Sequence, residues 1–148
     1  MEKEKVYCYE CDNDVEYEIK TRHKVALIRE VEVECDVDEC FCKKCGSYVL
    51  VERIEKKNEI KMYDEYKKKV GLLTSGEIKD LLKKRNISQR RLSKLLSIGE
   101  KDITRYINGA IQSRIIDKML RLVFDDEAYS RINSLFLEDK HTSKKASI

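Results

Sequence analysis

The sequence predicts an α+β protein, in which a small metal-bound β-sheet domain is followed by an all-α domain of five helices. Two Cys-x-x-Cys pairs flank a segment where apolar and polar residues alternate, as in half-buried strands. From residue 74 onward, apolar residues instead recur at three- and four-residue spacings between good helix caps. The expected domains are a sheet domain at 1–54, a linker helix at 55–72, a helical domain at 73–137 and a disordered tail at 138–148.

Charge divides the chain of 148 residues into two unlike halves. Residues 1–70 hold 15 Lys/Arg against 18 Asp/Glu, a net charge of −3, and residues 71–148 hold 16 against 10, a net charge of +6. A polyanionic partner is therefore expected for the second half only. No apolar run is long enough to span a bilayer and no signal segment follows the start, so we expect a cytoplasmic protein with no membrane partner. In that compartment its six cysteines are reduced or bound to metal.

The two cysteine pairs predict a zinc site. Cys8 with Cys11 and Cys42 with Cys45 supply four thiolates, the number that a structural Zn²⁺ takes. A gap of two residues lets one tight turn aim both sulfurs at the same ion. The 30 residues between the pairs exceed the usual spacer of about 15–20 and show the alternation of strands. A domain with so small a core should owe much of its stability to one structural zinc per chain.

Several thiol and histidine alternatives accompany this prediction. Cys35 falls on the apolar side of its strand and is expected in the core. Cys40 is an alternative to Cys42 as a metal ligand, but Cys42 is preferred because its spacing from Cys45 matches that of the first pair. A redox role is less favoured, because two pairs of equal spacing fit a single metal better. Catalytic zinc needs an open coordination position and usually a histidine or carboxylate ligand. The two histidines, His23 in an apparent hairpin turn and His141 in the tail, are interpreted as solvated. We therefore expect no enzyme.

Helix caps organise the second domain. Thr74 and Glu77 form a capping box, and Ser88 and Ser113 are further caps. The last two helices are more apolar than a core of this size needs, so they form either part of a dimer interface or simply core. Their apolar positions are Ile115, Ile116, Met119, Leu120, Val123, Tyr129, Ile132, Leu135 and Phe136.

Residues 88–109 predict a helix, a tight turn and a second helix. Gly99 interrupts the apolar pattern and can take a positive φ, and Gly109 stands just past the second helix, where glycine is expected. Between Lys79 and Arg105 there are nine Lys/Arg and three Asp/Glu. This combination is typical of a helix-turn-helix that binds DNA, and the plainer alternative is any pair of antiparallel helices with a solvated basic face.

The second helix of this motif would read bases with the face opposite Ile103 and Ile107. Lys101 and Arg105 are the expected readers, because Arg forks onto guanine O6 and N7, and Asp102 and Thr104 lie beside them. Phosphate contacts are expected from residues around them. These are Gln89, Arg90, Arg91, Tyr106 and Asn108.

The order of these parts resembles the YgiT/MqsA family of zinc-finger antitoxins and regulators. The matching features are the two cysteine pairs with Gly46, a charged helix with Tyr63 and Tyr66, and the segment 71–74 leading into the helix-turn-helix. The segments 87–89, 99–106 and 108–113 look like that family's Xre-type helix-turn-helix. The resemblance covers roughly residues 6–124.

This resemblance implies more than the residues do by themselves. It implies a structural zinc on the four paired cysteines, a homodimer formed through the helical domain, and a palindromic operator in double-stranded DNA through which the protein represses its own operon at the nucleoid. In toxin–antitoxin members the zinc module binds and blocks a toxin. Lys101 stands where MqsA-like members have Asn, so the role carries over without the operator sequence.

Two rival functions remain. In the first, the acidic zinc domain is a protein-interaction module that neutralises a toxin or binds another protein, and DNA binding is secondary. In the second, the protein is a zinc hydrolase or thiol oxidoreductase, but the sequence lacks a plausible base, a histidine ligand and a Gly-rich phosphate loop. The expectation is a sequence-specific transcriptional repressor, the antitoxin of a type II toxin–antitoxin system.

Overall fold

The computed structural model describes residues 4–146 of the chain, with side chains through Glu138. The chain forms two units, which divide between Lys69 and Val70. The first, here the sheet unit, contains small antiparallel sheets, and the second, the helical unit, contains only α-helices in its described part. The predicted α+β class, with a sheet region before the helices, is thereby confirmed.

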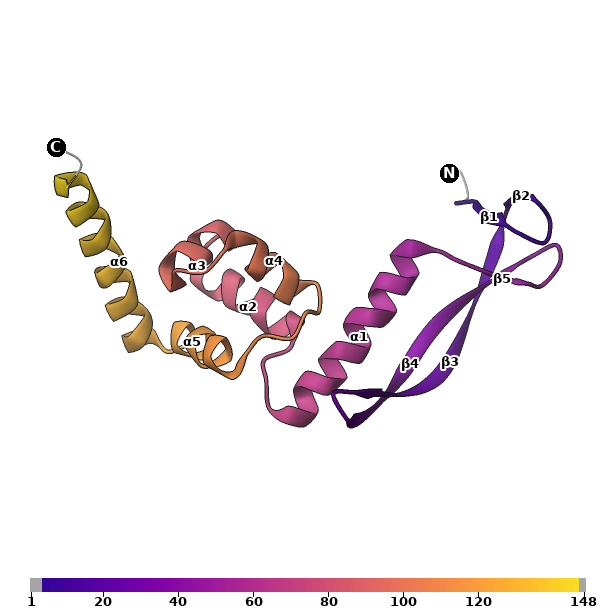
Figure 1. The fold of residues 1–148 in the computed structure, drawn as a ribbon, viewed down its shortest axis with the longest axis horizontal. Helices are drawn as coiled ribbons and strands as arrows, with labels where there is room; N and C mark the ends of the chain where they lie inside the picture. The colour runs from indigo at the N-terminus through magenta and orange to yellow at the C-terminus, as the bar shows by residue number, and fades with distance from the viewer. Residues whose placement is uncertain (1–3, 147–148) are drawn as a thin grey trace. The chain divides into compact units, whose positions relative to one another are not determined.

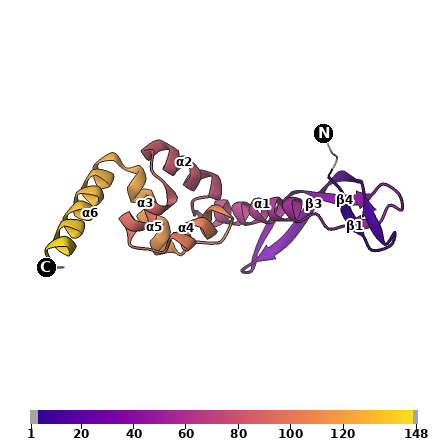
Figure 2. The same cartoon turned by 90° about the horizontal axis from the view of Figure 1, so that it is seen from above.

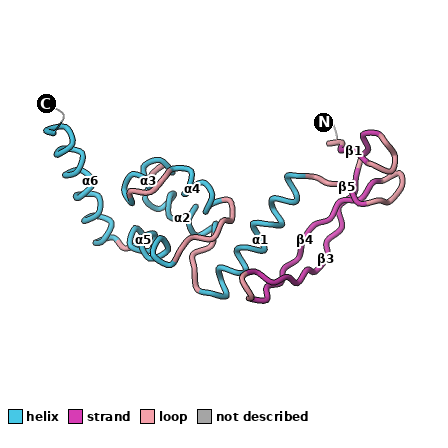
Figure 3. Tube along the Cα trace, in the orientation of Figure 1, coloured by secondary structure: helices cyan, strands magenta, loops and turns pink. Residues whose placement is uncertain are grey.

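Two sheets build the sheet unit (Figures 1 and 3). β1 (Val6–Cys8) pairs with β2 (Asn13–Val15) in a two-stranded ribbon. β3 (Tyr17–Ile28) and β4 (Val31–Cys42) form a long antiparallel hairpin, and β5 (Tyr48–Val49) pairs with the end of β4, in the order β3-β4-β5. A core that includes Cys8, Val15, Cys40, Cys42 and Val49 lies where the two sheets meet.

The hairpin turns at Arg29 and Glu30, which both adopt positive φ, of 48° and 67°. Positive φ at both central residues defines the turn whose twist matches the flanking strands. His23 lies in the middle of β3, where it faces Asp36, so its predicted position in a turn is wrong. Arg-Glu lacks the Asn or Gly that normally marks such a turn, which is why the sequence pattern placed it elsewhere.

Helix α1 (Glu52–Val70) is packed against the hairpin as part of the sheet unit, which corrects its prediction as a linker helix at 55–72 (Figure 1). Ile54, Met62 and Tyr66 are buried, and Val33 and Val37 of β4 are buried with them. Asn58 ties the helix to the strand, because its side-chain amide bonds both the N–H and the C=O of Asp38, at 3.0 and 2.8 Å. The boundary between the units therefore follows the helix instead of preceding it.

Within the described residues, five helices make up the helical unit, as predicted. They are α2 (Ser75–Arg85), α3 (Gln89–Leu96), α4 (Glu100–Ile107), α5 (Arg114–Phe124) and α6 (Asp126–Ala146), shown from two directions in Figures 1 and 2. The capping box of Thr74 and Glu77 is present, and Ser88 and Ser113 cap α3 and α5 through their hydroxyls. The core is aliphatic throughout and includes Leu73, Ile78, Leu81, Leu92, Leu96, Ile103, Ile107, Leu120 and Val123.

A buried polar cluster fastens the segment before α2 to α5. Oδ1 of Asp117 accepts from the Leu73 N–H at 2.8 Å and from the Gln112 side chain at 3.1 Å. The same Gln112 nitrogen donates to the Leu73 carbonyl at 2.8 Å, so both backbone groups of Leu73 are satisfied by side chains. Arg121 completes the cluster by donating to Oδ2 of Asp117 at 2.8 Å.

Arg85 of α2 caps the C-terminus of α5. Its guanidinium donates to the carbonyls of Val123 and Phe124, each at 2.7 Å, and Lys84 donates to the same Phe124 carbonyl at 3.0 Å. Cations at a helix C-terminus satisfy carbonyls that have no partner within the helix. Two of the basic side chains between Lys79 and Arg105 therefore serve the fold.

Helix α6 extends through residues 138–146, for which we predicted a disordered tail, so that prediction is wrong for this segment. The remaining tail residues, 147–148, lie outside the described part of the chain. Among the helices described, none combines the length and the apolar character that crossing a bilayer requires.

Candidate metal centre and candidate nucleic-acid interface

The four predicted ligands come together at one end of the sheet unit. The sulfurs of Cys8, Cys11, Cys42 and Cys45 all lie within 4.8 Å of one another. Cys8 and Cys45 are 3.5 Å apart, and Cys11 and Cys42 are 3.8 Å apart. A tetrahedral ion with metal–sulfur bonds of about 2.3 Å separates its sulfurs by about 3.8 Å, so the cluster could hold a metal ion.

Local backbone geometry explains how each pair turns its sulfurs inward. Asp12 follows the first pair with φ 51°, and Gly46 follows the second with φ 77°. Near Cys42, the N–H groups of Lys44 and Cys45 point at its sulfur, at 3.3 and 3.5 Å. Backbone N–H groups aimed at a sulfur stabilise the thiolate form, which is the form that binds metal.

The thiols of the cluster also differ in acidity. The hydroxyl and backbone N–H of Ser47 lower the pKa of Cys45 to about 6. Cys11 shares hydrogen bonds with Cys45, which together with burial raise its pKa to about 12. A thiolate is thus favoured at Cys45 first, and a bound cation would supply the charge that lets the others ionise. Ser47 is a member of this site that sequence reasoning missed, and its one signal is a hydroxyl two residues beyond the last cysteine.

The two remaining cysteines lie outside the cluster. Cys40 is buried in the core beside Val15 and Val49 and is not among the residues whose sulfurs meet. Cys35 is half-buried, with its sulfur 4.0 Å from that of Met62 on α1. Burial raises the pKa of both thiols. The competition between Cys40 and Cys42 is therefore decided in favour of Cys42 as the residue near the other three sulfurs.

In the helical unit, α3, a short turn and α4 form two packed helices. Leu92 and Leu96 of α3 and Ile103 of α4 are buried in the common core. The side chains of the two helices also meet at the surface, where the Thr104 hydroxyl donates to Oε1 of Gln89 at 2.8 Å. The first turn of α3 is thereby bonded to the exposed face of α4.

The turn between the helices uses a different residue from the one we expected. Ser97 ends α3 with φ 54°, and the Ile98 N–H returns to the Ser93 carbonyl at 2.9 Å. Gly99 has φ −67° and is the residue before the first turn of α4. Gly109 does take a positive φ, of 103°, just past α4 as predicted. Two bonds at the helix end hold Ser97 in the left-handed region, which is normally left to glycine or asparagine.

The predicted base-reading face of α4 is open to solvent. Lys101, Thr104 and Arg105 are exposed, and Asp102 is half-buried, with Oδ1 3.4 Å from the Arg105 guanidinium. Of the predicted phosphate contacts, Arg90 and Asn108 are exposed and Gln89 and Tyr106 are half-buried. Burial raises the pKa of Tyr106, so its phenol stays protonated at neutral pH.

Arg91 differs from the other predicted DNA contacts because it is turned toward α6. Its guanidinium donates to Oδ1 of Asn133 at 2.7 Å and lies 4.3 Å from the centre of the Phe136 ring. These contacts pack α3 against α6, and they engage the positively charged guanidinium of Arg91 inside the helical unit. We therefore leave Arg91 out of the group of residues available to a phosphate.

No protein-family model, curated protein or solved structure matches the chain. The fold and the sites by themselves define an α+β protein with a four-cysteine cluster able to hold a metal, followed by a helical unit in which Lys101, Thr104 and Arg105 of α4 are exposed.

Proposed function

We propose that the protein is a sequence-specific DNA-binding transcriptional repressor that carries a structural zinc ion. The observation that carries this proposal is the exposed face of α4, where Lys101, Thr104 and Arg105 project while Ile103 and Ile107 are buried. A helix that is held by its buried side and presents two cations and a hydroxyl to solvent suits the major groove. In this role Lys101 and Arg105 contact base edges, and Gln89, Arg90 and Asn108 position α4 on phosphates.

Zinc is the metal that we propose for the cysteine cluster. Four thiolates at these separations match its tetrahedral preference, and an all-cysteine shell leaves no coordination position for substrate. This supports a structural role for the metal and none in catalysis. The proposal therefore gives the sheet unit a metal-dependent fold and leaves DNA recognition to the helical unit.

The proposed repressor acts as a homodimer on a palindromic operator. An apolar groove of about 450 Å³ on the helical unit supports this, because Leu122 and Leu135 line it and remain exposed in one chain. Met119, Ile132 and Phe136 are half-buried in the same groove. A second copy seated there would bury these side chains and pair two α4 helices, one for each half-site.

The antitoxin role rests on the resemblance to the YgiT/MqsA family. It adds that the protein represses its own operon and that the sheet unit binds a toxin encoded nearby. A small basic toxin encoded by the adjacent reading frame, whose activity is relieved by this protein, would support that part. Repression of its own promoter without such a neighbour would limit the function to transcriptional regulation.

The first experiment is fluorescence anisotropy with DNA from upstream of the protein's own gene and with scrambled DNA of equal length. Arg105→Ala should weaken binding to the specific DNA by about 1–3 kcal/mol, the usual value of a good base contact, and change binding to scrambled DNA much less. Sedimentation of the complex should give two chains per duplex.

Arg131→Ala is the matched control, because it removes an equal charge from an exposed position on α6. It should leave the preference for the specific DNA unchanged. If Arg105→Ala weakens binding to both DNAs equally, Arg105 contacts phosphate only. If the unaltered protein shows no preference between the two DNAs, the proposed function is wrong.

A further inference from the structure

The two edges of the long β3–β4 hairpin differ in how they are covered by the rest of the sheet unit. β3 pairs with β4 over its whole length, from Tyr17 to Ile28, and no other strand pairs with it within the described residues. β4 is joined by β5 at its end and by α1 along the rest of its length. The contrast leaves β3 as a twelve-residue edge strand.

Side chains of α1 close the edge of β4 at its backbone groups. Lys69 donates to the Glu32 carbonyl at 2.6 Å, Lys61 donates to the Asp36 carbonyl at 2.9 Å, and Asn58 bonds both groups of Asp38. Glu32, Asp36 and Asp38 are all even-numbered, so the even residues of β4 direct their backbone groups away from β3. Covering an edge in this way prevents another chain from pairing with it.

The same alternation identifies the open backbone groups of β3. Each even residue of β4 lies opposite an odd residue of β3, and such pairs direct their N–H and C=O groups outward on both strands. The outward groups of β3 therefore belong to its odd residues from Ile19 to Leu27. Within the described chain no side chain closes them as α1 closes β4.

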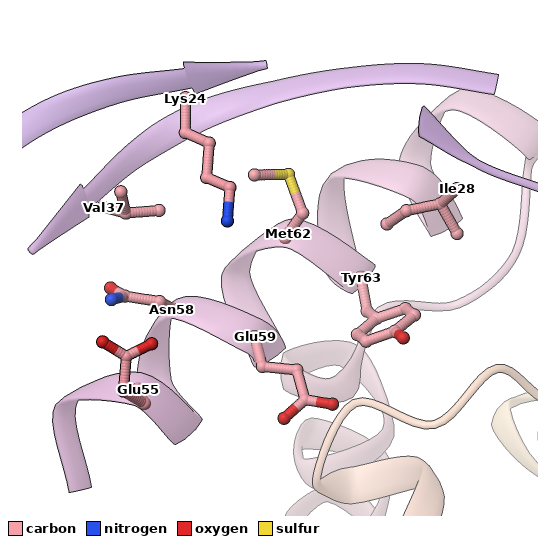
Figure 4. Close-up of a pocket in the computed structure, with 8 residues that line it drawn as sticks. All are labelled: Lys24, Ile28, Val37, Glu55, Asn58, Glu59, Met62 and Tyr63. Carbon is pink, nitrogen blue, oxygen red and sulfur yellow. The ribbon is translucent and has the colours of Figure 1, made fainter. Parts of the chain in front are cut away.

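Side chains along this open edge are separated by charge onto two faces. The even face carries three cations: Arg22 pairs with Glu39, Lys20 lies with its Nζ 5.2 Å from the centre of the Phe41 ring, and Lys24 extends toward α1 (Figure 4). A cavity of about 290 Å³ between the hairpin and α1 is lined in part by Lys24, Ile28 and Tyr63. The odd face carries apolar side chains that are 52–72% exposed, namely Ile19, Val25 and Leu27.

We propose that the free edge of β3 binds an extended acidic segment of another protein, which adds to the sheet as a strand. Its carboxylates lie beside Lys20, Arg22 and Lys24, and its apolar side chains lie beside Ile19, Val25 and Leu27. Backbone bonds supply affinity in strand addition, and the alternate side chains supply specificity. The opposite register would bring carboxylates to the odd face, which already carries the acidic side chains of β4.

Charge argues against a second copy as the occupant. Two β3 strands paired antiparallel about Arg22 would place Lys20 opposite Lys24 of the other copy, and like charges directly opposite are destabilising. The chain itself supplies the example of a suitable partner. β4 alternates apolar and acidic residues from Val31 to Asp38 as such a partner would, although its own pairing with β3 places the acids on the odd face, with Glu34 opposite Val25 and Glu32 opposite Leu27. This inference does not depend on DNA binding or on the antitoxin role.

The probe is a fluorescent peptide with the sequence of residues 31–39, in which serine replaces Cys35, and the control peptide carries Lys in place of every Asp and Glu. The full-length protein should bind the acidic peptide about tenfold or more tightly than the basic one. Amide hydrogen exchange should slow on binding at the odd residues from Thr21 to Leu27. The even residues of β3 are protected before the peptide is added.

Val25→Pro removes an outward N–H without removing a bond to β4, and Val25→Thr is its matched control. The proline variant should lose about tenfold in affinity and keep its even amides protected. If the proline variant does not fold, the double variant Lys20→Gln, Lys24→Gln tests the role of charge instead. It is expected to weaken binding of the acidic peptide and to leave binding of the basic peptide unchanged.

Equal binding of the two peptides, or protection confined to even amides, overturns the proposal. Protection of the same odd amides by self-association of the protein, or by a DNA duplex in place of the peptide, also overturns it.

Discussion

The cores of the two units are built from different side chains. In the helical unit all nine residues of the buried cluster are Leu, Ile or Val. In the sheet unit three of the seven are cysteines, and two of these, Cys8 and Cys42, belong to the candidate metal centre. The comparison teaches that the helical unit can fold through apolar burial alone, whereas the sheet unit, if its cysteine cluster holds the proposed metal, should need that cation to organise its sulfurs.

Metal removal should break the comparison most clearly. A strong chelator, or Cys42→Ser, should unfold the sheet unit and leave the helical unit folded, because binding free energies of structural zinc sites are about 10–16 kcal/mol. Two-dimensional NMR would show this as loss of dispersed amide signals from β3 and β4 with those of α2–α5 retained. Cys35→Ser, outside the cluster, should change neither.

A sheet unit that keeps its dispersed signals without metal would show that the comparison is mistaken, and that hairpin and α1 suffice. Loss of both sets of signals together would mean that the helical unit also depends on the metal.

The next largest effect should come from the polar cluster of the helical unit. Asp117→Ala leaves the buried Leu73 N–H without its acceptor, and we expect the free energy of unfolding to fall by about 3 kcal/mol, measured by urea with helical circular dichroism. Asp80→Ala, at an exposed position on α2, should change it by no more than about 0.5 kcal/mol.

The same carboxylate predicts a pH dependence. Burial acts to raise the pKa of Asp117, but bonds from Arg121, the Leu73 N–H and Gln112 outweigh it and hold the pKa below its usual value. The unfolded chain then takes up the proton first, so stability should fall as the pH drops below about 4 and through the lower pKa of the folded state. Asp117→Asn should show a smaller loss between pH 7 and pH 3, and an equal loss would assign the acid sensitivity to other groups.

A smaller loss of stability is expected within the sheet unit when the bonds between α1 and β4 are removed. Asn58→Ala removes both bonds to Asp38 and should lower the unfolding free energy of the metal-loaded unit by about 1–2 kcal/mol. The Asp38 amide should also exchange faster with solvent. Lys57→Ala, on the exposed side of α1, is the control. Equal changes in the two variants would show that the Asn58 bonds contribute nothing beyond helix propensity.

Local rules predicted much of the fold. The capping box at Thr74, the hydroxyl caps at Ser88 and Ser113, and the positive φ of Gly109 each depend on residues within a few positions of one another. The turn of each cysteine pair was predictable for the same reason, because a gap of two residues specifies its own turn. Residue type and spacing are sufficient where the interaction is local.

Long-range contacts account for what the sequence did not predict. The packing of α1 against β4 depends on Asn58 meeting Asp38, 20 residues away. From the sequence alone Arg91 is interpreted as a surface cation, because its contacts with Phe136 and Asn133 are more than 40 residues away along the chain. The turn at Arg29 and Glu30 has no glycine or asparagine, so its conformation is imposed by the pairing of the two long strands.

The internal bonds of Lys84, Arg85 and Arg91 lower the number of counterions that the protein should release when it binds DNA. Nine Lys/Arg lie between Lys79 and Arg105, and these three are held by helix-end carbonyls or by Asn133 and Phe136, which leaves six. Each phosphate that a protein neutralises releases about 0.9 of a condensed counterion from duplex DNA. If the protein binds DNA as proposed, the sensitivity of its affinity to salt should therefore correspond to at most six of these nine cations, because a cation that serves the fold releases no ion from the duplex.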